Sequence, residues 1–243
     1  MPQRPKPGRP KAAAGDAPDA KPHHVGHRRR LRDRFLASPQ SLPDYELLEL
    51  LLFQAIPRRD TKPLAKRLLA RFDGDLARLA NAGDAELKAV DGVGEAAIAV
   101  VRLFGEGARR LLRHRVQEQP VLGSWTQLLD YLRVAQGAKQ TEQFRLLFLD
   151  AKNRLVADEV HQTGTIDETP VYPREVAKRA LELGAAALIV VHNHPSGDPT
   201  PSKADIAITK EIAAALATLN IQLHDHLILG RGKHASLRTL GLL

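Results

Sequence analysis

Residues 187–205 read ALIVVHNHPSGDPTPSKAD and contain the most informative pattern in the chain. The run 187–191 is too short for an ordinary helix and too apolar for an exposed strand, so it predicts a buried central strand. His192 and His194 follow directly, and side chains two apart on an extended segment point the same way. Asp205 would join them from the first turn of a following helix. These three residues are therefore predicted to bind one metal ion at the carboxyl end of the strand.

Two imidazoles and one carboxylate form a donor set that suits Zn²⁺, with a water molecule in the fourth position of a tetrahedral site. The chain contains no cysteine, which excludes thiolate ligands and disulfides. Bound zinc lowers the pKa of its water from about 15.7 to about 7 and polarises a carbonyl. The pattern thus indicates a hydrolytic site with one zinc ion.

Hydrolysis also needs a carboxylate that does not bind the metal, because a proton must pass from the water to the leaving group. Two residues suit this role: Glu142, just ahead of the strand expected at 144–149, and Glu159, within the next expected strand. Ser202 is placed to donate a hydrogen bond to a developing oxyanion. Ser202 and Asp205 also fit a helix capping box, so a purely structural role for this pair stays open.

A second His-x-His pattern, His224 and His226, lies in a strand expected at 221–229. No acidic residue follows it at the matching downstream spacing. We therefore expect a structural role, or a hydrogen bond to a metal ligand, rather than direct metal binding.

Composition and periodicity divide the chain into four parts. Residues 1–27 are rich in Pro, Ala, Lys and Arg and predict a disordered basic tail. Residues 28–115 predict an all-helical domain. Gln, Pro and Gly accumulate in 116–123, which predicts a linker. Residues 124–243 alternate helical and strand patterns and predict an α/β domain.

The formal net charge of +8 is concentrated at the N-terminus. Residues 1–34 hold ten Lys or Arg against three Asp, whereas the remaining chain has 26 basic and 25 acidic residues. The tail is thus suited either to contact an anionic polymer or simply to aid solubility. No run approaches the roughly 18 apolar residues of a membrane span, and the N-terminus lacks the apolar core of a secretory signal, so we expect a cytoplasmic protein without membrane contact.

Gly92, Val93 and Gly94 resemble the turn of a helix-hairpin-helix, in which backbone amides and a helix N-terminus approach a DNA phosphate. Glycine suits such a turn because a side chain would block the approach. Asp91 and Glu95 flank the turn and would repel a phosphate. DNA contact and a purely structural helical module are therefore both open.

The spacing of the metal pattern is similar to that of a known motif. His192-x-His194-Pro195, six residues, Ser202, two residues and Asp205 resembles the JAMM motif of the MPN metalloprotease superfamily. The wider match, over about residues 120 to 243, resembles the bacterial RadC family in particular. The helical half resembles the N-terminal region of the same UPF0758-type family.

The resemblance implies an MPN (JAMM) α/β domain with a mixed, curved sheet flanked by helices, preceded by a small all-α, helix-hairpin-helix-like domain. It implies zinc held by His192, His194 and Asp205. The catalytic glutamate of JAMM peptidases precedes a core strand, so Glu142 is a better match than Glu159. The implied activity is hydrolysis of a peptide or isopeptide bond in a peptide or protein substrate.

Two other functions remain open. One is a DNA-binding accessory factor in recombination or repair, with a regulatory or vestigial metal site. The other is a metal-dependent nuclease, although such enzymes usually call for two metals and more carboxylates. The complete spacing of Ser202 and Asp205 favours a competent site over a vestigial one.

Overall fold

The computed structural model of the chain describes residues 26–164 and 171–243. By their contacts these residues form two compact units, one ending at Leu42 and the other running from Pro43 to Leu243, and each is considered by itself. None of the described helices combines the length and the apolar character needed to span a bilayer.

The first unit contains α1 (His27–Ala37) and a short 3-10 turn, η1 (Pro39–Ser41). This helix agrees with the all-helical character predicted for residues 28–115. The tail predicted at 1–27 lies outside the described residues as far as residue 25, and its last residue is the first of α1.

The helical half of the second unit consists of α2 (Asp44–Ala55), α3 (Lys62–Arg71), α4 (Leu76–Asn81), α5 (Asp84–Lys88) and α6 (Glu95–Glu118). One apolar stripe of each helix packs into a common core, in which Leu52, Leu68 and Leu79 are buried. The all-helical character predicted for this half is confirmed, and its core is built from apolar residues at helical spacing.

The other half of the second unit contains one mixed sheet in the order β2-β1-β3-β4-β5. The strands are β1 (Gln143–Leu149), β2 (Leu155–Thr163), β3 (Ala187–Asn193), β4 (Gln222–Leu229) and β5 (His234–Ser236). β1 runs antiparallel to both β2 and β3, β3 runs parallel to β4, and β5 is antiparallel to β4. The mixed α/β fold implied by the resemblance is confirmed, and β3 lies at its centre.

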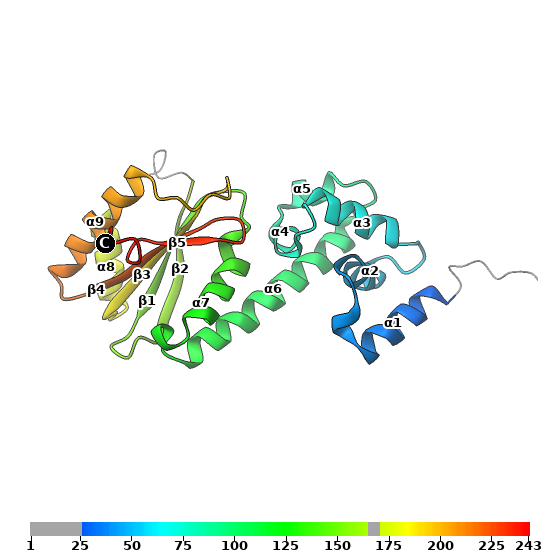
Figure 1. Cartoon of the computed structure of the whole chain (residues 1–243), viewed down its shortest axis with the longest axis horizontal. Coiled ribbons are helices and arrows are strands. Elements are labelled where there is room, and N and C mark those ends of the chain that lie inside the picture. Colours follow the sequence, from blue (N-terminus) through cyan, green and yellow to red (C-terminus); the bar gives the residue numbers. More distant parts are fainter. Residues whose placement is uncertain (1–25, 165–170) are drawn as a thin grey trace, which may run out of the picture. The chain divides into compact units, whose positions relative to one another are not determined.

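Helices cover both faces of the sheet (Figure 1). On one face lie α7 (Trp125–Leu132) and the end of α6; on the other lie α8 (Pro173–Glu182) and α9 (Lys203–Ala217). Side chains of a strand alternate between faces. Ile189 and Val191 of β3 therefore pack toward α7, and Leu188 and Val190 toward α8 and α9. Burial on both faces explains why this strand is apolar without alternation.

The segment 116–123, which the sequence predicts to be a linker, is packed structure. α6 continues to Glu118, a 3-10 turn η2 (Val121–Gly123) follows, and Val116 and Val121 are fully buried against the sheet. Two valines supply this burial although Gln, Pro and Gly surround them. The short strand β5 is an addition that the sequence did not predict, because three residues carry no detectable periodicity.

A buried polar network connects α7, β1 and β2. Arg145 forms an ion pair with Asp158, which also accepts a hydrogen bond from the Tyr131 hydroxyl. Gln136, in the π-helical turn η3 (Arg133–Gly137), accepts a hydrogen bond from Arg145 Nε at 2.7 Å and donates to the Gln143 carbonyl at 2.5 Å. Burial, followed by the charge of Asp158, raises the pKa of Tyr131 to about 12. The network fixes the start of β1 against η3.

Replacing Asp158 should strongly destabilise this domain. In Asp158→Ala the buried Arg145 guanidinium loses its counter-charge, and we expect the free energy of unfolding to fall by roughly 3–5 kcal/mol. Urea unfolding followed by circular dichroism measures the change. Asp130→Ala is the matched control, because its ion pair with Arg133 is about half exposed, and should change stability by less than about 0.5 kcal/mol. Equal effects of both variants would contradict the role of the network.

Candidate metal centre

The proposed metal ligands come from the end of β3 and the first turn of α9. His192 pairs with Phe144 of β1 and Ile228 of β4 across the sheet, and it is fully buried. Its ring stacks on the Phe144 ring, with 6.3 Å between centroids. The central position of β3 thus holds the first imidazole rigidly, and the strand's extended backbone directs His194 to the same side.

The three side chains converge as the spacing predicts. His192 Nε2 lies 2.9 Å from His194 Nε2 and 3.2 Å from Asp205 Oδ1, and His194 Nε2 lies 3.6 Å from Asp205 Oδ2. One ligand atom from each residue lies within 4.8 Å of the others. Among the described residues this is the group of metal-binding side chains that the structure brings together, and it could hold a metal ion.

The hydrogen bond of His194 determines which of its ring nitrogens is free. Its Nδ1 lies 2.7 Å from the Asp198 carbonyl oxygen, which can only accept. The proton of the neutral ring is therefore on Nδ1, and the lone pair of Nε2 faces His192 and Asp205. A backbone carbonyl that accepts a hydrogen bond from one ring nitrogen of a histidine commonly orients the other nitrogen toward a metal.

A longer chain of hydrogen bonds determines which ring nitrogen of His192 is free. Thr209 Oγ1 donates to the Asp205 carbonyl oxygen at 2.5 Å, so it accepts from His226 Nδ1, also at 2.5 Å. Burial lowers the pKa of His226 well below its ordinary value, so its ring is neutral and Nε2 accepts from His192 Nδ1 at 2.7 Å. His192 Nε2 is then left as a free lone pair. The donor set therefore fits a metal with two neutral imidazoles and one carboxylate.

The electrostatics of the site favour an ionised Asp205. Burial raises the pKa of its carboxyl, but the close contacts of its oxygens with the His192 and His194 rings outweigh this, so the pKa lies well below the ordinary value. The pKa of His194 is raised, first by its contact with Asp205. The charge of Glu142 adds to this increase. The Glu142 carboxylate thus lies within electrostatic range of His194.

Ser202 and Asp205 do form a capping box at the start of α9. Ser202 Oγ accepts from the Asp205 amide at 3.1 Å, and Asp205 Oδ2 accepts from the Ser202 amide at 2.7 Å. The capping role and a role at the centre are therefore compatible. Since the Ser202 hydroxyl accepts from the helix and the side chain is exposed, its proton remains available to a substrate.

Asn193, which the sequence did not single out, fixes the segment that carries Glu142. It is fully buried and points to the face opposite His192. Its Oδ1 accepts from the Gln143 amide at 3.0 Å, and its Nδ2 donates to the carbonyl oxygens of Lys139 and Thr141 at 3.2 Å each. The only feature of the sequence that could have indicated this role is the position of Asn193 between His192 and His194.

The two alternative glutamates have different surroundings. Glu142 directly precedes β1 and is half-buried. Glu159, on β2, forms an ion pair with Arg179 of α8, whose Nε and Nη2 donate to both carboxylate oxygens at 2.6–3.2 Å. Hydrogen bonds from Arg179 lower the pKa of Glu159. The Glu159 carboxylate is thus already engaged as a structural ion pair.

The second His-x-His pattern divides between two roles. His226 is the buried partner of His192, whereas His224 Nε2 hydrogen bonds to Asn153 Oδ1 at 2.6 Å in the β1–β2 turn. Neither belongs to the metal-binding group. The structure shows a hydrogen bond between His226 and His192, which is a candidate metal ligand.

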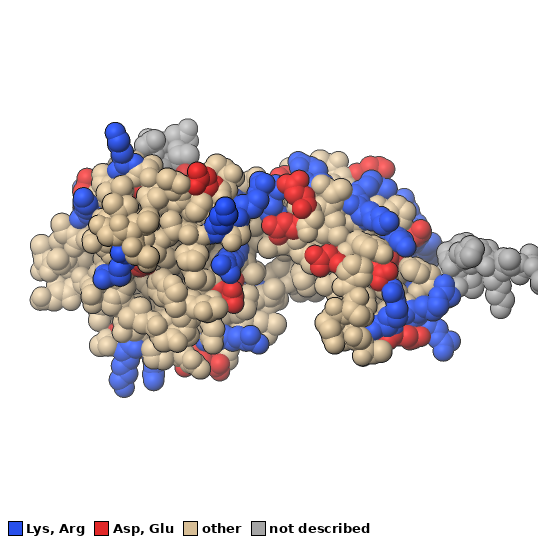
Figure 2. All heavy atoms as spheres, viewed as in Figure 1, with Lys and Arg blue, Asp and Glu red and all other residues tan. Residues whose placement is uncertain are grey.

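The glycine turn of the helical half lies between α5 and α6. Gly92 has a φ of +90°, which favours glycine, and Gly94 precedes the first turn of α6. Gly92 and Gly94 are exposed, and Val93 is half-buried against the helical core. In the face shown in Figure 2, basic and acidic side chains are interspersed over the helices. Contact of Gly92, Val93 and Gly94 with a DNA backbone stays a prediction.

The mixed sheet and the His-His-Asp group at the end of its central strand define a JAB/MPN-type domain. A family model described as RadC-like JAB domain matches residues 122–242, and one described as UPF0758 N-terminal matches residues 23–99. A protein of Rhodobacter capsulatus named UPF0758 protein is 56% identical over 214 residues, which is 88% of this chain and 100% of the relative. The chain belongs to this UPF0758 family and carries a RadC-like JAB domain.

The role of His226 can be tested through metal affinity. In His226→Leu the His192 ring loses the acceptor that fixes its tautomer, so we expect zinc affinity to fall roughly 10–100-fold. Competition with a chromophoric chelator measures the affinity. His224→Leu is a matched control on the same strand and should bind zinc as the parent does. If both variants bind zinc equally, the hydrogen-bond chain does not support the site.

Proposed function

We propose that this protein is a zinc-dependent metallopeptidase of the JAMM type, cleaving peptide or isopeptide bonds. The observation that carries the proposal is the convergence of His192 Nε2, His194 Nε2 and Asp205 with free lone pairs on one point. Two nitrogen donors and one carboxylate suit zinc among the common divalent ions. A bound zinc ion would supply Lewis acidity, activating a water molecule and polarising the substrate carbonyl.

The chain's own residues perform the proton transfers. Glu142 takes a proton from the attacking water and delivers it to the leaving nitrogen, as a general base and then a general acid. Its charge already acts on His194 across the site. Ser202, exposed at the start of α9, donates its hydroxyl proton to the oxygen of the tetrahedral intermediate. Glu159 is not suited to this role because Arg179 engages both of its oxygens.

The competing functions have less support in the described residues. A nuclease usually positions two metal ions with additional carboxylates, whereas the group found in residues 26–164 and 171–243 contains one carboxylate and two histidines. An accessory factor with a vestigial site has no need of the hydrogen bonds that set both tautomers. These hydrogen bonds therefore favour a working metal centre.

Glu142→Gln should retain zinc but lose hydrolysis. Because general acid–base catalysis contributes about 10²–10⁴-fold, we expect kcat to fall by that factor. Zinc-loaded protein is incubated with a mixed peptide library and with ubiquitin-like isopeptide conjugates, and products are measured by mass spectrometry. Glu159→Gln is the control and should cut within a few-fold of the parent rate. Activity lost with Glu159 and kept without Glu142 would reverse the assignment, and a parent protein that cuts neither substrate would remove the proposal.

Asn193→Asp should slow the same reaction without removing the metal. The aspartate keeps an acceptor for the Gln143 amide but loses the donor that holds Lys139 and Thr141. Glu142 is then less well positioned, and we expect kcat to fall roughly 10–100-fold. Zinc content and the substrate KM should stay near the parent values. A proportional loss of zinc would show that Asn193 acts on the ligands instead.

A further inference from the structure

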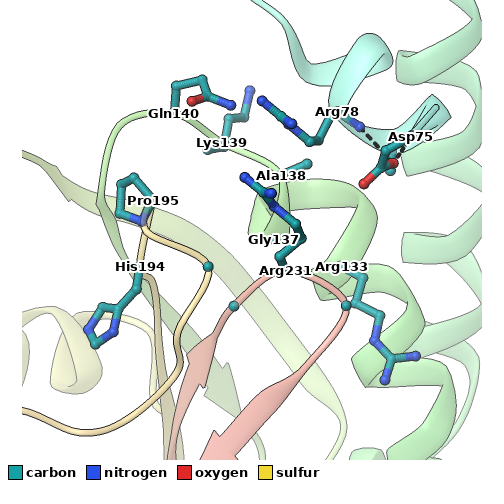
Figure 3. Close-up of a pocket in the computed structure, with 14 residues that line it drawn as sticks. Asp75, Arg78, Arg133, Gly137, Ala138, Lys139, Gln140, His194, Pro195 and Arg231 are labelled. Carbon is teal, nitrogen blue, oxygen red and sulfur yellow. Dashed lines mark hydrogen bonds between the residues drawn. The ribbon is translucent and has the colours of Figure 1, made fainter. Parts of the chain in front are cut away.

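A cleft with a volume of about 170 Å³ opens beside the candidate metal centre. His194 and Pro195 form one side of it, and Arg78, Lys139 and Arg231 line the other (Figure 3). In the close-up these three basic side chains are turned toward the same space. We call this space the basic cleft. Because His194 belongs to both, a ligand in the basic cleft would lie next to the metal centre.

The position of Arg231 is fixed by close packing of two loops. Its amide donates to the Gly197 carbonyl oxygen at 2.9 Å, and the His194 amide donates to the Leu229 carbonyl oxygen at 2.9 Å. A side chain at Gly230 would collide with the Gly197 carbonyl. The tip of the β4–β5 hairpin therefore rests directly on the loop that follows β3, and Arg231 is held beside the site.

Lys139 is a half-buried cation without an acidic partner among the described residues. Burial lowers the pKa of its ammonium, and the charges of Arg102, Arg145 and Arg109 lower it further. Each of these arginines forms an ion pair with a carboxylate of its own. Those carboxylates are therefore already engaged and do not neutralise Lys139. The backbone of Lys139 is held by Asn193. A cation fixed in this environment would be stabilised by an anionic ligand.

Two of the three arginines that line the basic cleft share one carboxylate, whereas Arg133 pairs with Asp130. Arg78 forms an ion pair with Asp73, and Arg231 Nη1 lies 4.0 Å from the same group. Asp75 also lines the cleft, but its carboxylate accepts from the first amides of α4. The three basic side chains thus retain capacity for a further acceptor.

The dimensions and lining of the basic cleft favour a carboxylate side chain over nucleic acid. Its volume is close to that of cavities that hold one benzene-sized group, so it suits a single side chain. Its lining contains no Phe, Tyr or Trp, whereas single-stranded nucleic acids are commonly bound by stacking on such rings. Carboxylates match the planar donors of arginine and the point charge of lysine.

We propose that the basic cleft binds an acidic side chain of a peptide substrate, close in sequence to the bond presented to the metal centre. This inference rests on the proposed peptidase function and adds a substrate class to it. Lys139 and Arg231 are the specificity-determining residues, and neither takes part in the proton transfers.

The test measures binding separately from cleavage, using the full chain with zinc and the Glu142→Gln background. The probes are a short fluorescein-labelled peptide with two adjacent glutamates and the same peptide with glutamines, followed by fluorescence anisotropy. We expect the glutamate peptide to bind about tenfold more tightly, and Lys139→Gln or Arg231→Gln to remove that difference. Lys152→Gln is the matched control, because the β1–β2 turn lies at the opposite end of β1 from Glu142. It should leave the difference unchanged.

Three outcomes would overturn the proposal: equal binding of both peptides, equal loss in the Lys152 variant, or a Lys139-dependent preference for a single-stranded oligonucleotide over the glutamate peptide. The last would identify a nucleic-acid groove instead. Charge-selective binding without any cleavage by the parent protein would support the basic cleft and count against the peptidase function alone, so the two failures are distinguishable. Basic residues elsewhere contribute equally to all variants and cancel in the comparison.

Discussion

The opposite orientation of neighbouring side chains on β3 is the constraint on which the candidate site depends. His192 points toward α9, and Asn193 points toward the segment before β1. One imidazole therefore reaches the metal-binding point while the next residue fixes the backbone around Glu142. The strand can impose this arrangement because it is the buried centre of the sheet and has little freedom to shift its register.

Asp205 connects helix formation to the chemistry of the site. Its carboxylate accepts from the Ser202 amide and also faces both imidazoles. Its carbonyl oxygen accepts from Thr209, which starts the hydrogen-bond chain through His226 to His192. The first turn of α9 thus supplies one candidate ligand and also sets the protonation of another. A helix start that was displaced would disturb both functions at once.

The surroundings of the site combine a neutral interior with charges at its edge. His226 is kept neutral by burial, whereas Lys139 and Arg231 present positive charge beside His194. An interior of neutral imidazoles suits a cation, and the basic edge suits an anionic substrate group. The neutral interior and the basic edge lie close together because Gly230 of the β4–β5 hairpin packs against Gly197 of the loop after β3.

Local patterns of residues were sufficient to predict those features that depend on short separations along the chain. The apolar run 187–191 predicted the central strand, and the spacing of His192, His194 and Asp205 predicted their convergence, because strand and helix geometry fix such short separations. Which distant side chains meet these residues depends instead on how the strands and helices pack. Asn193 meets residues more than fifty positions earlier, and His226 reaches His192 only through the parallel pairing of β3 and β4. The engagement of Glu159 by Arg179, and the lack of an acidic partner for Lys139 within residues 26–164 and 171–243, likewise depend on packing, which no local periodicity encodes.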